Sequence, residues 1–145
     1  MNALIVYDSQ FGNTKMIAKA IAGEIAKSEK AKAVHVSDAK VQELKGFDVL
    51  VVGSPTQVWK PMPAIQKFLE NLPDLDGLRA AAFDTRMKSP QIFTGSAAHA
   101  IAKELQKKGA KLVLAPESFF VEGTKGPLRM GEIERAEEWA RLILR

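Results

Sequence analysis

The chain has 145 residues, with 21 lysines and arginines against 17 aspartates and glutamates, a formal charge of +4 and no cysteine. This length is typical of one globular domain, and a content of 46% hydrophobic and 26% charged residues excludes a disordered or fibrous chain. The lack of cysteine excludes disulfide scaffolds, thiolate zinc sites and cysteine nucleophiles, so redox chemistry would need a bound cofactor. We therefore expect residues 1–145 to form a single domain.

The first residues of the chain carry no recognisable targeting signal. Met1 leads directly into the apolar run Ala3–Tyr7, no basic segment precedes this run, and Asp8 ends it. The run is too short for a membrane span, so we expect a cytoplasmic protein without membrane contact. The lysines are scattered along predicted helix faces without a nucleic-acid-binding motif, so we expect no nucleic acid partner.

Short apolar runs alternate with amphipathic stretches along the whole chain. In chain order, this pattern predicts a strand at Ala3–Tyr7, a helix over 14–27, a strand at Ala33–Val36, a short helix over 39–45, a strand at Val49–Val52, a helix over 62–71, a strand at Ala80–Phe83, a helix over 97–108, a strand at Leu112–Ala115 and a helix over 132–144. Residues 116–131 form the longest predicted irregular connection. Near-continuous apolar strands that alternate with helices indicate a parallel sheet covered on both faces, which is an α/β doubly wound domain.

The first candidate site is the loop after the first predicted strand, because open parallel sheets bind ligands at the carboxyl ends of their strands. Residues 8–14 supply two hydroxyls, two amide side chains and backbone N–H groups at the start of a predicted helix. This combination suits a phosphate group. The same residues also fit a plain helix start, with Ser9 or Asn13 as the cap and Gly12 in the turn.

Two further loops follow the third and fourth predicted strands. In the first of them, Trp59 stands between Pro55 and Pro61, where it could form a platform for a flat ring or fold inward as a packing plug. The next loop begins at Asp84 and brings cationic and polar groups to the same edge of the sheet, unless it is an ordinary solvated turn.

At this point the residues resemble a known family. Ser9-Gln10-Phe11-Gly12-Asn13-Thr14 resembles the phosphate loop of flavodoxins, and Val52-Gly53-Ser54-Pro55-Thr56 followed by Trp59 resembles their loop that places an aromatic ring against the isoalloxazine. The resemblance covers essentially the whole chain and is to the short-chain type. It implies a flavodoxin-like three-layer α/β/α sandwich, a five-stranded parallel sheet in the order 2-1-3-4-5, and FMN as the cofactor.

The resemblance also implies which residues contact the cofactor. The phosphate would lie against Ser9, Gln10, Phe11, Gly12, Asn13 and Thr14, one side of the ring against Pro55, Thr56, Gln57, Val58 and Trp59, and the pyrimidine edge against Asp84, Thr85 and Arg86. Met87 or Phe93 would cover the opposite face of the ring. We expect no catalytic side chain and no metal site, since neither His35 nor His99 has a second ligand at suitable sequence spacing.

The sequence departs from the flavodoxin pattern in several respects. Phe11 stands where a phosphate-loop hydroxyl is usual, the loop from Thr56 to Trp59 contains no glycine, and the chain is basic where electron-carrying flavodoxins are acidic. We expect an FMN-binding electron-transfer protein that acts as a monomer with a redox protein partner or a nicotinamide-dependent donor. Two alternatives stay open: an NAD(P)H-dependent FMN quinone reductase, favoured by the basic loops, and a flavin-free interaction module, favoured by Phe11.

Overall fold

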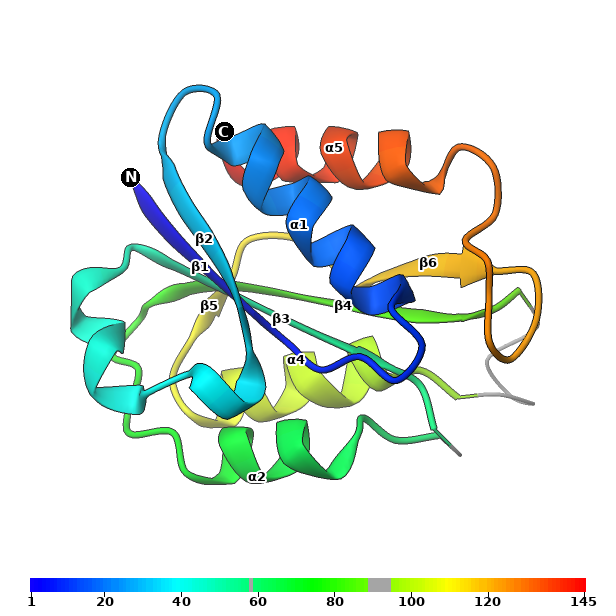
Figure 1. The fold of residues 1–145 in the computed structure, drawn as a ribbon. Coiled ribbons are helices and arrows are strands. Elements are labelled where there is room, and N and C mark those ends of the chain that lie inside the picture. Colours follow the sequence, from blue (N-terminus) through cyan, green and yellow to red (C-terminus); the bar gives the residue numbers. More distant parts are fainter. Residues whose placement is uncertain (58, 89–94) are drawn as a thin grey trace.

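The computed structural model describes residues 1–57, 59–88 and 95–145, and its centre is a twisted parallel sheet (Figure 1). The strands are β1 (Asn2–Tyr7), β2 (Lys30–His35), β3 (Val49–Pro55), β4 (Arg79–Met87), β5 (Lys111–Leu112) and β6 (Glu117–Val121). They follow the order β2-β1-β3-β4-β5, and β6 also pairs with β4. The expected order 2-1-3-4-5 is therefore confirmed, with one additional strand.

Helices cover both faces of this sheet (Figure 1). α1 (Asn13–Ile25) and α5 (Glu132–Ile143) lie on one face, and α2 (Pro63–Glu70) and α4 (Ala97–Lys107) lie on the other. The short helix expected over residues 39–45 is a 3-10 helix, η2 (Val41–Gly46), and a second one, η1 (Val36–Asp38), precedes it. None of the helices that the structure describes is long and apolar enough to cross a bilayer.

Alternation along the strands divides the core into two clusters, one on each face of the sheet. Ile5 and Val51 pack toward α1 and α5, whereas their neighbours Leu4 and Leu50 pack toward α2 and α4. All four side chains are buried. Both faces of the central strands are therefore apolar, which explains why these strands appear in the sequence as continuous hydrophobic runs.

The fifth strand differs from the predicted strand at Leu112–Ala115. β5 ends at Leu112, the chain leaves the sheet around Pro116, and β6 continues the pairing inside the segment that was expected to be irregular. Arg79 pairs with Lys111 and Phe83 pairs with Glu117, so the fifth strand uses more residues than β4 over the same distance. Pro116 has no N–H group to donate to a neighbouring strand, and Glu117 and Ser118 after it interrupt the apolar pattern of a buried strand. The second half of the fifth strand was therefore not predicted.

Glu132, at the start of α5, fixes β6 to this helix. Its carboxylate accepts hydrogen bonds from Phe120 N at 2.7 Å and from Arg135 Nε at 2.9 Å. Burial raises the pKa of Glu132, but the hydrogen bonds from Arg135 and Phe120 outweigh this effect and hold the pKa below its usual value of 4.5.

The lowered pKa predicts a pH-dependent contribution to stability. A carboxyl group whose pKa is lower in the folded state stabilises the fold above its unfolded pKa, and this contribution is lost as the pH falls through the folded value. The difference in unfolding free energy between the parent protein and Glu132→Gln should therefore be larger at neutral pH than in acid. Urea unfolding of both proteins at neutral and acidic pH measures it, and a constant difference would contradict the prediction.

Candidate functional site

The loops at the carboxyl ends of β1, β3 and β4 surround a cavity of about 620 Å³. Most predicted site residues line it, together with two that were not among them, Val121 and Thr124. The lining residues are Ser9, Gln10, Phe11, Asn13, Thr14, Pro55, Thr56, Gln57, Trp59, Thr85, Arg86, Met87, Val121 and Thr124. Of the remaining predicted contacts, Gly12 and Asp84 do not line the cavity, while Val58 and Phe93 lie outside the described residues.

One end of the cavity is formed by the loop that leads into α1. Gly12 precedes the helix with a left-handed φ of +92°, which glycine adopts without steric cost. The Ser9 hydroxyl accepts hydrogen bonds from the N–H groups of Gly12 at 3.0 Å and Lys15 at 3.4 Å. Of the two residues considered as helix caps, Ser9 therefore accepts hydrogen bonds from N–H groups at the start of α1. The Asn13 side-chain amide instead donates to the Lys125 carbonyl at 3.3 Å.

Several backbone donors of this loop have no acceptor within the described part of the protein. They are the N–H groups of Gln10, Phe11, Asn13 and Thr14. Unpaired N–H groups at the start of a helix, where the helix dipole is positive, form a site suited to an anion. No acidic side chain lies in the first turn of α1 to oppose a bound anion.

The opposite side of the cavity is formed by a tight turn from Gln57 to Lys60. The two residues exchange backbone hydrogen bonds of 2.7 and 2.9 Å, and Trp59 within the turn has a left-handed φ of +75°. Trp59 is 48% exposed and lines the cavity, so it is not a packing plug. Its backbone forms a bridge with Gly95, where a Cβ atom would lie only 2.5 Å from the Trp59 Cα.

The left-handed backbone of Trp59 leads to a testable prediction. A residue with a Cβ atom pays about 1 kcal/mol in this conformation, and glycine does not. Trp59→Gly and Trp59→Ala both remove the ring, but only the alanine variant retains the strain. Urea unfolding without added flavin should therefore show the glycine variant to be more stable by about 1 kcal/mol. Equal stability, or a more stable alanine variant, would show that the turn is unstrained.

The third predicted loop begins later than expected, because β4 continues to Met87. Asp84 therefore lies within the strand, is completely buried, and is turned away from the cavity, while Thr85 lines it. The Thr85 hydroxyl lies 2.8 Å from the Thr14 hydroxyl and connects β4 to α1. Arg86 donates from Nε to the Ser118 hydroxyl at 3.0 Å, so this part of the chain is not a plain solvated turn.

Asp84 connects the two segments that flank the cavity. Its Oδ2 atom accepts hydrogen bonds from the hydroxyls of Ser96 at 2.7 Å and Thr56 at 3.2 Å, and from Ala98 N at 3.0 Å. Thr56 in turn accepts a hydrogen bond from Ala97 N at 2.9 Å. Asp84 thus anchors the segment after β3 to the start of α4, behind the wall of the cavity.

The segment after β6 contributes residues that the sequence did not identify. Val121 and Thr124 line the cavity, and the Lys125 ammonium lies 6.0 Å from the centre of the Phe11 ring. The length of the predicted connection was the only signal in the sequence. Its position next to the α1 loop depends on the pairing of β6 with β4, which was not predicted.

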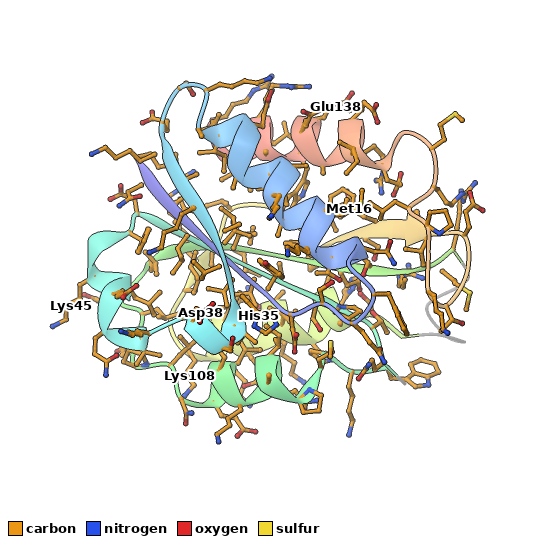
Figure 2. All side chains as sticks on the ribbon, viewed as in Figure 1. Met16, His35, Asp38, Lys45, Lys108 and Glu138 are labelled. Carbon is orange, nitrogen blue, oxygen red and sulfur yellow. The ribbon has the colours of Figure 1, made fainter. Side chains whose placement is uncertain are left out.

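The two histidines form local contacts. His35 Nε2 lies 3.0 Å from Asp8 Oδ1, an acidic neighbour that sequence spacing did not reveal because Asp8 directly follows β1, the strand that pairs with β2. Figure 2 shows His35, the last residue of β2, and Asp38, the last residue of η1, near the carboxyl end of β2. His99 Nδ1 lies 3.0 Å from the Ser96 hydroxyl. Within residues 1–57, 59–88 and 95–145, no three His, Asp or Glu side chains form a cluster that could hold a metal ion.

Comparison with known proteins assigns a family to this architecture. A family model described as flavodoxin domain matches residues 4–132. A flavodoxin of Aquifex aeolicus (strain VF5) is 36% identical over 90 residues, which represent 57% of this chain and 48% of the relative. The match therefore spans about half the length of that relative.

Solved structures show the same architecture over nearly the full chain. A flavodoxin from the domain Archaea is 25% identical, with a TM-score of 0.81, and the match covers 99% of this chain and 96% of the other. Oxidised Flavodoxin 1 from Bacillus cereus is 20% identical with a TM-score of 0.83, and the match covers 99% and 97% of the two chains. At 20% identity, the similarity to the Bacillus cereus protein concerns the fold alone.

Proposed function

The chain belongs to the flavodoxin family, and from this premise we propose that its cavity binds FMN and that the protein carries electrons between redox partners. Membership of the family implies a flavin. The observation that carries the choice of FMN is the set of N–H groups of Gln10, Phe11, Asn13 and Thr14, which have no acceptor among the described residues and provide donors for a phosphate. When bound, FMN would supply the reversible uptake of electrons.

The cavity has the size and surfaces that such a group needs. Its volume of about 620 Å³ falls within the range of small-ligand sites, roughly 300–1,000 Å³. The exposed ring of Trp59 offers a flat apolar surface, and Met87 provides a second apolar contact. In this arrangement the α1 loop would hold the phosphate, and the segments after β3 and β4 would orient the ring and exclude water from it.

The lining favours an electron carrier over a stand-alone reductase. Arg86 is the only ionisable side chain among the described residues that line the cavity, and a guanidinium serves as a hydrogen-bond donor and not as a general acid or base. An electron carrier needs no such group, because the cofactor performs the chemistry and the protein controls its environment. A quinone reductase that takes electrons from NAD(P)H is the competing proposal, since lysines near the cavity could contact the phosphates of a nicotinamide nucleotide.

The visible absorption spectrum of the purified protein, followed by titration of the apoprotein with FMN and with riboflavin, tests the proposal. We expect flavin bands and an affinity for FMN about 100-fold higher than for riboflavin, which corresponds to about 3 kcal/mol from the phosphate contacts. Comparable affinities, or no binding at micromolar concentration, would contradict it. Flavin-dependent oxidation of NAD(P)H with a quinone as the acceptor would favour the reductase.

The variant Phe11→Thr provides an internal control for this titration. It introduces a hydroxyl into the α1 loop, where one hydrogen bond to the phosphate is worth about 1 kcal/mol. FMN should therefore bind about fivefold more tightly, while the affinity for riboflavin stays the same. A parallel change for both flavins would show that residue 11 acts on the ring or on the loop conformation and not on the phosphate.

A further inference from the structure

The segments around the mouth of the cavity carry a strong excess of positive charge. Lys60 closes the turn after β3, Lys88 follows β4, and Lys125 belongs to the segment after β6. We call these three residues the basic rim. All three are exposed, and none of them forms an ion pair within the described part of the chain.

Acidic residues on the same segments do not neutralise the basic rim. Asp8 is buried and lies against His35 Nε2 at 3.0 Å. Glu122 is exposed, but its carboxylate lies 3.9 Å from Arg129 Nε. Close opposite charges largely cancel each other at a distance, so the three lysines leave a net positive charge on the segments that surround the cavity.

The same mouth also exposes large apolar side chains. Phe11, Trp59 and Met87 are 43%, 48% and 44% exposed, and all three line the cavity. The described part of the chain has only three other exposed large hydrophobic residues, namely Met16, Met130 and Leu142. Apolar side chains inside a charged border are typical of protein interaction surfaces, in which the apolar centre provides affinity and the charges provide orientation.

We propose that the basic rim and its apolar centre dock a redox protein whose own electron-transfer face is acidic. The inference rests on the proposed electron-carrier function and specifies the partner that this function requires. Three lysines without ion-pair partners attract an acidic face during diffusion and repel a basic one. They therefore raise both the association rate and the affinity for acidic partners relative to basic ones. Docking at the mouth would bring the partner to the edge of the flavin site.

Stopped-flow electron transfer to two haem proteins of opposite charge tests the proposal. The dithionite-reduced holoprotein is mixed with ferric cytochrome b5, which is acidic, or with ferric cytochrome c, which is basic. Each transfer moves one electron from the reduced flavin to one ferric haem, which becomes ferrous. Between about 20 mM and about 500 mM sodium chloride, the rate with cytochrome b5 should fall about tenfold, and the rate with cytochrome c should stay constant or rise.

A matched pair of triple variants assigns the effect to the basic rim. Lys60→Gln, Lys88→Gln and Lys125→Gln together should remove most of the salt dependence with cytochrome b5, without a change in FMN affinity. The control variant carries Lys30→Gln, Lys45→Gln and Lys111→Gln, at positions near the amino-terminal edge of the sheet. It therefore loses the same number of positive charges. Figure 2 shows Lys45 at the end of the molecule opposite the loop that leads into α1. The control should retain the salt dependence of the parent protein.

The outcomes separate this proposal from the proposed function. Rapid transfer to cytochrome c that slows with salt, or equal effects of the two triple variants, would overturn the docking surface while electron transfer stands. Nuclear magnetic resonance of the labelled apoprotein with cytochrome b5 tests docking without flavin. Shift changes at Phe11, Lys60, Lys88 and Lys125 would support the surface even if no flavin bound, and changes elsewhere, or none, would overturn it.

Discussion

Replacing Gly53 by alanine should lower the free energy of unfolding by about 3 kcal/mol or more. A Cβ atom at this position in β3 would overlap the Phe83 ring, which is completely buried. The ring cannot move aside easily, because it packs edge-on against Phe119 and Trp139, at centroid distances of 6.0 and 6.2 Å. Urea unfolding of the variant and of the parent protein measures the effect.

Gly23→Ala provides the matched control for this substitution. Gly23 lies within α1, and a Cβ atom there would have no other atom within 4 Å. Alanine is the better helix former, so this variant should gain about 1 kcal/mol. The cost of Gly53→Ala should also shrink in a Phe83→Leu background, because the overlapping ring is gone. An unchanged cost would show that the strain has another source.

Replacing Asp84 by alanine should lower the free energy of unfolding by about 3 kcal/mol or more and weaken FMN binding at least about tenfold. The variant leaves the hydroxyls of Ser96 and Thr56 and the Ala98 N–H without their common acceptor. The segment after β3 then keeps the hydrogen bond from Ala97 N to Thr56 but loses the links through Asp84 to Ser96 and Ala98, so the surface proposed for the ring is held less firmly. Urea unfolding and FMN titration measure the two effects separately.

Two further variants distinguish anchoring from a general loss of charge. Asp84→Asn keeps the shape and one acceptor, so it should cost less than the alanine variant in both measurements. Asp38→Asn removes an exposed carboxylate in η1 and should leave stability and FMN affinity unchanged. FMN affinity within twofold of the parent value in Asp84→Ala would show that the cavity does not depend on this anchor.

The loop before α1 was predictable from the sequence because its interactions are local. Ser9 contacts the N–H of Gly12 three residues later, and the left-handed turn at Gly12 depends on that glycine alone. The Trp59 loop was predictable only in part. Its prolines and its place after an apolar run put it at the correct edge of the sheet, but the contact of Trp59 with Gly95 was not visible.

Asp84 shows why the site after β4 was less predictable. The apolar run ends at Phe83, and this end suggested a loop from Asp84 onward, but hydrogen bonds to neighbouring strands extend β4 to Met87. Side chains in a strand alternate between the two faces, so Thr85 lines the cavity while Asp84 is buried behind it. β3 likewise continues beyond the predicted strand Val49–Val52 to Pro55, so Gly53 lies inside the strand and pairs with Phe83.

The sequence by itself determined the alternation of strands and helices and, through local turn chemistry, the loop that suits a phosphate. These features depend on neighbouring residues, whose spacing is visible in the chain. The tertiary structure decided the second half of the fifth strand, the approach of Thr124 to the cavity and the role of Asp84. These features depend on strand pairing and on contacts between distant segments, and hydrophobic periodicity does not specify either.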